Sequence, residues 1–487
     1  MATTNTAASY FTLNPGGSNG TTHTNGTSNT NGTSHANGIS HTNGTSHTNG
    51  TSHTNGSSHI NGKISKNLPI VIAGGGCVGL FLALLLAQSD IPNKVIVIEP
   101  EQPDPSSTRA MAHQPPTYPI FSKVEGLLPE LIKTGSLSSG LCFRNSLQNG
   151  DKIIAEKTFD NSGEGMKGKG QLLLPQGKFQ QVLMKRLAAL DEKAEIRIGV
   201  SVTGLRPSRD SVDVKTTPTP TSSRLGIEWI EAAYLIDASG AHSTIRKELG
   251  VKLEGETLAA QLVATDLYFD FHSHGFYDAN FIIDPRSYGL IGRISHATDS
   301  KPPLWRVSYG VPLSTTEEEI KKDVDEKLRL MLPNKGRNSE GAIAYEITRI
   351  APYKAQQRLV ESLYHASSHT CLVGDAAHLT NPYAGLGLAS GMADASSLAE
   401  VLIHIMSDRA LNEERLLKSW SDARREKFLS AIDMPSRMAY QRVKTDVSSD
   451  EKIHEFMTRD PLVGALNKGM PVQPPSLETK VHELEGW

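Results

Sequence analysis

A cluster of four glycines directly after a short apolar stretch constrains the fold of this chain more than any other feature. Gly74-Gly75-Gly76-Cys77-Val78-Gly79 separates an apolar run at 68–73, typical of a strand, from one at 80–88, typical of a helix. The first glycine permits a tight turn, Gly76 lets the backbone approach a diphosphate, and Gly79 lets helix and strand pack closely. The diphosphate would lie at the positive end of the helix. The segment therefore predicts a strand, turn and helix that bind a dinucleotide.

An acidic residue ends the next apolar run. Val95 to Ile98 is followed by Glu99, which lies twenty residues after Gly79. A carboxylate at this place accepts hydrogen bonds from an adenosine ribose, as in NAD or FAD sites, and disfavours the 2′-phosphate of NADP. The alternative interpretation, a glycine turn that binds no ligand, is disfavoured because the strand, the helix and the acidic residue all occur at the expected spacing. A membrane span over 70–87 is disfavoured by the central glycines and the short length.

Residues 1–66 differ in composition from the rest of the chain. Asn-Gly recurs every six residues from Asn19 to Gly62, with Ile39 and Ile60 as the only large apolar residues between them. Such a tract cannot offset its chain entropy by burial, so we predict a disordered, low-complexity tail. Its histidines lack a scaffold, and we predict no metal site. The start of the chain has no apolar segment typical of a secretory leader.

The remainder is expected to be a cytoplasmic protein with a large core. The full chain has a net charge of −3, which gives no electrostatic basis for nucleic-acid binding, and no membrane span is predicted. Three cysteines, Cys77, Cys142 and Cys371, lack metal-ligand spacing. We expect them to be buried and reduced.

Hydrophobic periodicity predicts the order of further elements. A helix begins at Gln176, and three strands follow at 196–205, 211–216 and 227–236. The stretch 262–311 is strand-like and rich in aromatic residues, which predicts a packed sheet over the site and an apolar substrate. From 386 to 444 the pattern is mostly helical. The charged face of its last part is either solvated or packs against a second copy, which leaves a homodimer open.

Two more segments have a strand that runs into a glycine turn and a helix. The first is 236–246, with Ser239-Gly240 at the turn, and the second is 371–389, with Gly374-Asp375 at the strand end. Asp375 can hold a sugar-alcohol or ribityl hydroxyl. Unpaired amides at the start of the second helix can face a flavin pyrimidine edge and stabilise an anionic reduced flavin.

Together the three segments resemble the class A, para-hydroxybenzoate hydroxylase-like FAD-dependent monooxygenases, from about residue 68 to 440. The resemblance assigns cofactor binding to Gly74, Gly76, Gly79, Glu99, Arg109, Gln176, Gly240, Asp375, Gly385, Gly387 and Leu388. Two departures are visible. Ser239 stands where an aspartate is usual, which puts the details of the pyridine-nucleotide contact in doubt. Ala389 stands where an asparagine is common.

The resemblance implies an α/β fold in which a Rossmann-like, glutathione-reductase-like FAD-binding domain is interleaved with a mixed-sheet substrate domain. The expected divisions are the tail at 1–66, the first part of the FAD-binding domain at 67–257, the substrate-binding sheet mainly at 258–365, the second part of the FAD-binding domain at 366–405, and C-terminal helices and tail at 406–487.

The resemblance also implies a reaction. NADPH or NADH reduces FAD, O2 forms a flavin C4a-hydroperoxide, and this hydroxylates or epoxidises an electron-rich aromatic or polycyclic substrate, a chemistry that fits secondary metabolism. Pro382 and Tyr383 would lie beside the hydroperoxide, and Arg144 is a candidate to hold a phenolate. The other candidates are His272, Tyr288 and Arg306. Another FAD oxidoreductase, oxidase or halogenase-like, and a noncatalytic FAD-binding protein remain alternatives.

Overall fold

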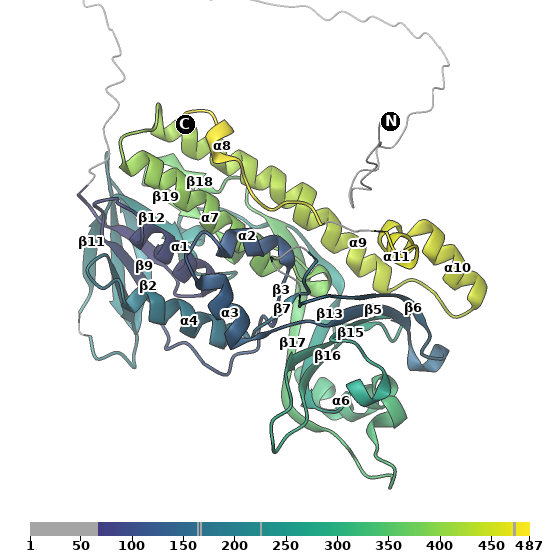
Figure 1. The fold of residues 1–487 in the computed structure, drawn as a ribbon. Helices are drawn as coiled ribbons and strands as arrows, with labels where there is room; N and C mark the ends of the chain where they lie inside the picture. Colours follow the sequence, from purple (N-terminus) through teal and green to yellow (C-terminus); the bar gives the residue numbers. More distant parts are fainter. Residues whose placement is uncertain (1–66, 163–164, 166–167, 225, 471–473) are drawn as a thin grey trace, which may run out of the picture. The chain divides into compact units, whose positions relative to one another are not determined.

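Strand β1 (Ile70–Ala73) lies inside a six-stranded sheet of order β18-β19-β12-β1-β2-β8 in the computed structural model (Figure 1). The pairs β19–β12, β12–β1, β1–β2 and β2–β8 are parallel, and only the edge strand β18 is antiparallel. Parallel sheets are covered on both faces, which is why all of β1 is apolar and buried. The other strands are β2 (Val95–Glu99), β8 (Ala194–Ile198), β12 (Tyr234–Asp237), β18 (Tyr364–His365) and β19 (Thr370–Leu372).

The structure describes residues 67–162, 165, 168–224, 226–470 and 474–487. The predicted low-complexity tail at 1–66 lies outside the described residues. Cys77, Cys142 and Cys371 are buried free thiols, as predicted. Within the described ranges, every helix is too short or too polar to cross a bilayer.

A second, mixed sheet of eight strands has the order β20-β17-β13-β16-β15-β14-β5-β6. Its pairs are antiparallel except β14–β5, which is parallel. The aromatic stretch predicted as strands forms its centre, so the α/β architecture with a mixed second sheet is confirmed. The strands are β5 (Gly140–Asn145), β6 (Ile153–Thr158), β13 (Glu254–Tyr268), β14 (Ala279–Ile283), β15 (Gly289–Ser295), β16 (Leu304–Pro312), β17 (Glu346–Leu359) and β20 (His378–Leu379).

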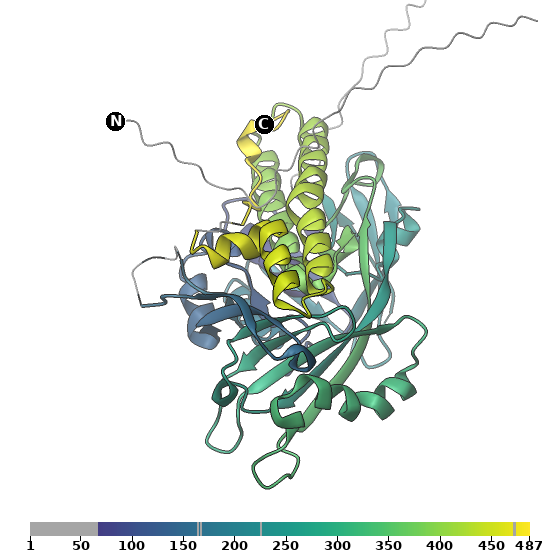
Figure 2. The ribbon, with the colours of Figure 1, turned by 90° about the vertical axis from the view of Figure 1, so that its right-hand side faces the viewer.

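Helices cover the two faces of this sheet at different places. Helix α6 (Glu317–Met331) covers one face of the sheet (Figure 2). Its Ile320, Val324 and Leu328 belong to the apolar cluster on that face. Helices α10 (Asp450–Arg459) and α11 (Pro461–Asn467) contact β5, β6 and β14 through a separate apolar cluster. Strands β5 and β6 precede residue 258, so the sheet extends beyond the range expected for the substrate domain. The parallel pairing of β5 with β14 joins distant segments, and no local pattern encodes it.

Two runs that the sequence predicts as single strands are each divided between sheets. The run 196–205 breaks at Gly199, whose φ is +78°, so β8 joins the six-stranded sheet and β9 (Val200–Pro207) joins a three-stranded one. The run 227–236 breaks at Ala233 into β11 (Glu228–Ala232) and β12. In the three-stranded sheet, β10 (Val212–Pro218) lies between β9 and β11 and pairs antiparallel with both. A small fourth sheet joins β3 (Ala112–His113), β7 (Leu172–Leu173) and β4 (Ser136–Leu137).

The C-terminal part is helical, as predicted. Helix α8 (Glu413–Lys427), a π-helical turn at Phe428–Asp433 and α9 (Met434–Val443) follow one another without a break and form one rod (Figure 1). The other helices are α1 (Cys77–Ala87), α2 (Tyr118–Phe121), α3 (Leu127–Thr134), α4 (Gln176–Ala188), α5 (Thr244–Glu248) and α7 (Gly387–Met406).

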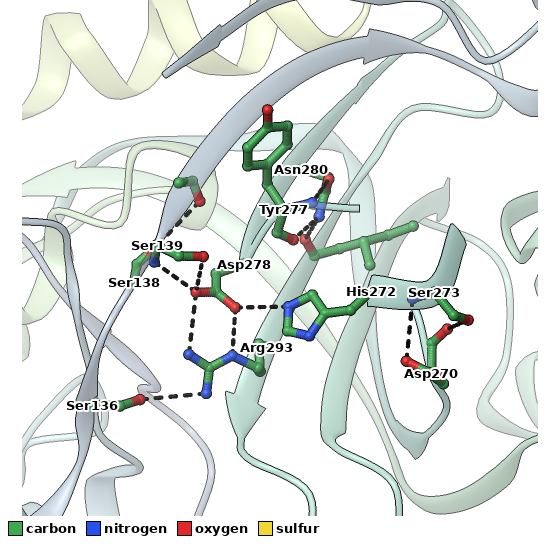
Figure 3. Close-up of polar contacts among 12 residues, drawn as sticks. Ser136, Ser138, Ser139, Asp270, His272, Ser273, Tyr277, Asp278, Asn280 and Arg293 are labelled. Atoms are coloured by element: carbon green, nitrogen blue, oxygen red, sulfur yellow. Dashed lines mark hydrogen bonds and ion pairs between the residues drawn. The ribbon is translucent and has the colours of Figure 1, made fainter. Parts of the chain in front are cut away.

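A buried ion pair joins β15 to the segments that precede β14 and β5 in the eight-stranded sheet (Figure 3). The Asp278 carboxylate accepts hydrogen bonds from Arg293 Nε at 2.5 Å and from the Ser139 amide at 2.7 Å, and His272 Nε2 lies 3.1 Å away. Asp278 and Arg293 are both 2% exposed. Burial alone would raise the pKa of Asp278, but the bonds from His272, Arg293 and Ser139 outweigh it and hold the pKa below its usual range.

We expect Asp278→Asn to lower the free energy of unfolding at pH 7 by about 3–5 kcal/mol, because it leaves the Arg293 charge buried and unpaired. A carboxylate whose pKa is lowered by folding stabilises the protein above its ordinary pKa, and that stability is lost as the pH falls further. The difference between wild type and variant should therefore shrink below about pH 4. Urea unfolding at several pH values measures this, with the exposed Asp270→Asn as control. A constant difference down to pH 3 would contradict the account.

Candidate active site

The turn between β1 and α1 contains the three glycines of the predicted dinucleotide motif, Gly74, Gly76 and Gly79. Of these three, only Gly76 has open space beside it. A Cβ at Gly74, whose φ is +110°, would lie 2.4 Å from the Ala238 carbonyl oxygen, and one at Gly79 would lie 2.1 Å from the Gly74 oxygen. A Cβ at Gly76 would meet nothing within 4 Å. The fold itself therefore requires Gly74 and Gly79, whereas Gly76 borders space that a ligand can enter. Helix α1 begins there with no side-chain cap and no acidic residue in its first turn.

Glu99 holds this turn from the end of β2. Its Oε2 accepts a 2.6 Å hydrogen bond from the Gly75 amide, and its Oε1 accepts one of 3.1 Å from the Glu101 amide. Burial raises the pKa of Glu99, and these two amides act against that rise. The predicted ribose acid thus also fixes the glycine turn, a role that its position in the sequence does not reveal.

Helix α4 adds a contact to the same turn. Its first residue is Gln176, as predicted, and the Gln176 carbonyl oxygen lies 3.9 Å from Cys77 Sγ at the start of α1. One turn later, Gln180 Nε2 donates to the Gly75 carbonyl at 3.1 Å. Sequence reasoning missed Gln180. Its spacing of four from Gln176 on the same helix face is the signal that could have indicated it.

A second helix begins with free amides next to the first. The segment 374–387, called here the cofactor loop, contains a 3-10 turn at Pro382–Ala384 and leads into α7, whose start has no side-chain cap. Val78 in the first turn of α1 contacts this region, because a Cβ at Gly374 would lie 3.4 Å from its Cγ2 and one at Gly391 2.7 Å away. The structure thus brings together the two helix starts that the sequence predicted separately.

Asp375 lies on the cofactor loop without a bonding partner. Its side chain is accessible to solvent, and it accepts no hydrogen bond from any residue that the structure describes. The surrounding protein nevertheless desolvates the carboxylate and raises the pKa of Asp375. An acceptor that is open to solvent and takes no hydrogen bond from the described protein is free to accept one from a ligand hydroxyl. A Cβ at Gly387 would meet only Thr380 Cγ2 at 3.6 Å, so the start of α7 is open as well.

The middle segment joins the two turns. Asp237 at the end of β12 accepts hydrogen bonds from the Ser239 amide at 3.0 Å and hydroxyl at 2.5 Å, and from the Ser243 hydroxyl at 2.5 Å. Ser239 thus bonds within its own turn. Burial raises the pKa of Asp237, and the serine hydrogen bonds act against it. Arg246 Nη1 donates to the Ala376 carbonyl at 3.1 Å, which ties this segment to the cofactor loop.

Another buried network holds the cofactor loop from the α7 side. Asp394 Oδ2 accepts a hydrogen bond from the Gly374 amide at 3.0 Å and lies 2.6 Å from His378 Nε2, and its Oδ1 accepts one from Arg424 Nε at 2.8 Å. Burial alone would raise the pKa of Asp394, but the His378 and Arg424 side chains outweigh it and lower the pKa. Sequence reasoning missed this network because its members come from three separate elements.

Arg109 lies in the segment between β2 and β3, and its backbone is fixed by Arg306. Arg306 Nη1 donates to the Arg109 carbonyl at 3.1 Å and Nη2 to the Thr108 carbonyl at 2.7 Å, while Nε contacts Asp266 at 2.7 Å. The Arg109 side chain itself is exposed. Arg306 was a candidate to hold a phenolate, and the structure pairs it with Asp266 instead.

Tyrosines form the wall next to the 3-10 turn of the cofactor loop. The Tyr383 ring is buried, with its centroid 5.5 Å from that of Tyr440 on α9 and 6.1 Å from that of Tyr288. The Tyr383 hydroxyl is buried and has no hydrogen-bond partner among the described residues. Tyr353 on β17 is 39% exposed, yet the protein around it raises its pKa by desolvation.

Arg144 lies on the opposite face of the eight-stranded sheet from Arg306. The register aligns Arg306 with Gly292, and Gly292 with Ala279 and Leu141 across β15, β14 and β5. Side chains alternate along a strand, so Arg144, three residues after Leu141, points to the other face. Its guanidinium lies 4.0 Å from the Phe276 ring centroid, within the cluster that packs against α6, and its Nε is 2.8 Å from Asp151. His272, another candidate, contacts Asp278.

Comparison with known proteins gives consistent matches. The family model described as "FAD binding domain" matches residues 67–433. The para-nitrophenol 4-monooxygenase of Pseudomonas sp. (strain WBC-3) is 32% identical over 360 residues, which cover 74% of this chain and 83% of that protein. The 6-hydroxy-3-succinoylpyridine 3-monooxygenase HspB of Pseudomonas putida (strain DSM 28022 / S16) is 30% identical over 374 residues, 76% of this chain and 87% of that one.

Solved structures agree in fold. The crystal structure of p-nitrophenol 4-monooxygenase PnpA from Pseudomonas putida DLL-E4 superposes with a TM-score of 0.71 at 28% identity, covering 82% of this chain and 96% of that chain. The ternary complex of aklavinone-11 hydroxylase with FAD and aklavinone gives a TM-score of 0.63 at 21% identity, covering 79% of this chain and 71% of that chain.

Because Gly76 borders open space and Gly79 does not, alanine substitutions at these two glycines form a matched pair of variants. We expect Gly79→Ala to lower the free energy of unfolding by about 1–3 kcal/mol, because its methyl group overlaps the Gly74 oxygen. Gly76→Ala should unfold like the wild type without ligand but bind FAD at least about tenfold more weakly, because its methyl group fills the space beside the helix start. Thermal unfolding and titration with FAD measure the two effects. Unchanged FAD affinity in Gly76→Ala would contradict this site.

Proposed function

This chain belongs to the FAD binding domain family as a FAD-dependent monooxygenase, and on that premise we propose that its substrate is an electron-rich aromatic compound with a free hydroxyl group. Two relatives are named for aromatic substrates, para-nitrophenol and a hydroxypyridine. The observation that carries the proposal is the Tyr383 hydroxyl on the cofactor loop, which is buried and has no hydrogen-bond partner among the described residues. A phenolic oxygen would supply its missing hydrogen bond.

We propose that NAD(P)H and O2 are the cosubstrates, and that FAD, when bound, supplies the electron transfer and the oxygen activation. The adenosine ribose is assigned to Glu99 and the diphosphate to the amides at Gly76 and the start of α1. Asp375 would accept a hydrogen bond from a ribityl hydroxyl. The amides of Gly387 and Leu388 at the start of α7 would hold the pyrimidine edge, where the helix dipole favours negative charge. Arg109, Gln176, Gly240 and Gly385 complete the predicted contacts.

The other proposed site residues contact or enclose the substrate. Pro382 and Tyr383 border the reacting ring, and the apolar residues around Tyr288, Tyr383 and Tyr440 exclude water from it. Arg144 receives no role here, because it faces α6. The matched relatives are monooxygenases, so the oxidase, halogenase-like and noncatalytic alternatives gain no support from them. A homodimer, a cytoplasmic location and a place in secondary metabolism stay predictions.

Turnover with isotopically labelled O2 tests the proposed reaction. The purified protein loaded with FAD is mixed with NADPH or NADH and a panel of phenols and polycyclic phenols. We expect one phenol at least to accelerate NAD(P)H oxidation and to gain one labelled oxygen atom, as measured by mass spectrometry. Oxidation that releases only hydrogen peroxide, with no labelled product from any phenol, would contradict the proposed substrate class.

The Tyr383 hydroxyl gives a residue-level test. We expect Tyr383→Phe to raise KM for a phenolic substrate by roughly three- to tenfold, the value of one hydrogen bond of about 0.5–1.5 kcal/mol. Its thermal stability should stay equal or rise, because an unpaired buried hydroxyl is removed. Tyr309→Phe, in the cluster that packs against α6, is the control. Equal KM values for both variants and the wild type would rule out the role given to Tyr383.

A further inference from the structure

Gln357 is buried where β17 meets the cofactor loop. It is 1% exposed, and its neighbour Arg358 pairs with Leu379 of β20. Its Oε1 accepts hydrogen bonds from the Asn381 amide at 2.5 Å, from Asn381 Nδ2 at 3.0 Å and from the Thr380 hydroxyl at 2.9 Å. One side-chain oxygen therefore holds the two residues that precede Pro382.

Asn381 transmits this contact to the catalytic side of the loop. Its Oδ1 accepts a 3.1 Å hydrogen bond from the Tyr383 amide, which caps the 3-10 turn at Pro382–Ala384. Asn381 is fully buried. The position of Pro382 and Tyr383 thus depends on Asn381, and that of Asn381 depends on Gln357.

The nitrogen of the same amide bonds to the C-terminal rod. Gln357 Nε2 donates to Asp433 Oδ1 at 2.8 Å. Asp433 is the last residue of the π-helical turn, and its Oδ2 accepts a 2.7 Å bond from Arg437 Nε in α9. Irregular π turns within helices occur frequently at functional sites. Here the turn places a carboxylate where it orients the Gln357 amide.

The backbone of Gln357 is fixed as well. Gly255 on β13 has a φ of +133°, and a Cβ there would lie 2.1 Å from the Gln357 carbonyl oxygen. The backbone of Gln357 is therefore closely packed against Gly255 at the point where its side chain begins. It connects three parts of the site: the substrate-facing sheet, the cofactor loop, and the rod whose Tyr440 packs on Tyr383.

We propose that Gln357 is a positioning residue that sets Pro382 and Tyr383 relative to flavin and substrate, and that Asp433 orients its amide for this task. The proposal rests on the proposed function. Its consequence is that Gln357 controls how much of the NAD(P)H oxidised yields product and how much yields peroxide. A displacement of about 1 Å in a reacting geometry can change a rate by about a hundredfold.

The test compares three variants of the FAD-loaded enzyme. Gln357→Met removes the hydrogen bonds of the side chain and keeps a similar side-chain volume. Gln357→Glu keeps the acceptor for Asn381 but sets a carboxylate against Asp433. The double variant Gln357→Glu with Asp433→Asn reverses donor and acceptor and restores the bond. We expect the first two to change the visible circular dichroism of bound flavin and to lower product per NAD(P)H by about tenfold, and the double variant to recover both.

Gln356→Met, on the neighbouring position of β17, is the matched control and should behave like the wild type. A Gln357→Met enzyme with wild-type dichroism and coupling would overturn the proposal, as would a double variant no better than Gln357→Glu. The comparison of Gln357→Glu with the double variant decides the matter if Gln357→Met fails to fold. If the wild type hydroxylates no phenol, the proposed function fails, and the flavin dichroism alone then supports or overturns the positioning role.

Discussion

The close contact between the start of α1 and the end of β12 is the constraint on which the rest of the site depends. Gly74 packs against the Ala238 carbonyl and Gly79 against Gly74 with no room for a Cβ. Because these backbones touch, the first turn of α1 can carry Val78 onto the cofactor loop. Two helix starts without side-chain caps then lie together, and their free amides and positive ends favour one negatively charged, elongated ligand.

Two buried polar side chains, Asp394 and Gln357, fix the loop that such a ligand would contact. Asp394 holds its beginning through Gly374 and His378, and Gln357 holds its middle through Asn381. Buried polar groups of this kind stabilise one arrangement because any other would leave them unpaired. The open acceptor at Asp375 and the unpartnered hydroxyl of Tyr383 lie within the same loop. The protein thus holds the loop by hydrogen bonds at Gly374, His378 and Asn381. The side-chain oxygens of Asp375 and Tyr383, which form no such bond with any described residue, lie where cofactor and substrate are proposed to bind.

The sequence predicted the parts of this site that local spacing encodes. The glycine turn, Glu99 at the end of β2 and the helix start at Gln176 all follow from short-range patterns of apolar and glycine residues. It did not predict the strand breaks at Gly199 and Ala233, since apolar runs do not show which sheet a strand joins. The face of Arg144, the pairing of β5 with β14, and the hydrogen bonds of Asp394 and Gln357 depend on contacts between distant segments, which local patterns do not carry.

Cofactor identity tests the central claim most directly. The visible absorption spectrum of the purified protein is recorded, and the cofactor released by denaturation is identified by chromatography. The account predicts a yellow protein that releases FAD, one per chain, and that regains the spectrum when FAD is added back. A colourless protein that binds NAD but does not take up added FAD would contradict it, because the space at Gly76, the carboxylate of Asp375 and the start of α7 would then serve no flavin.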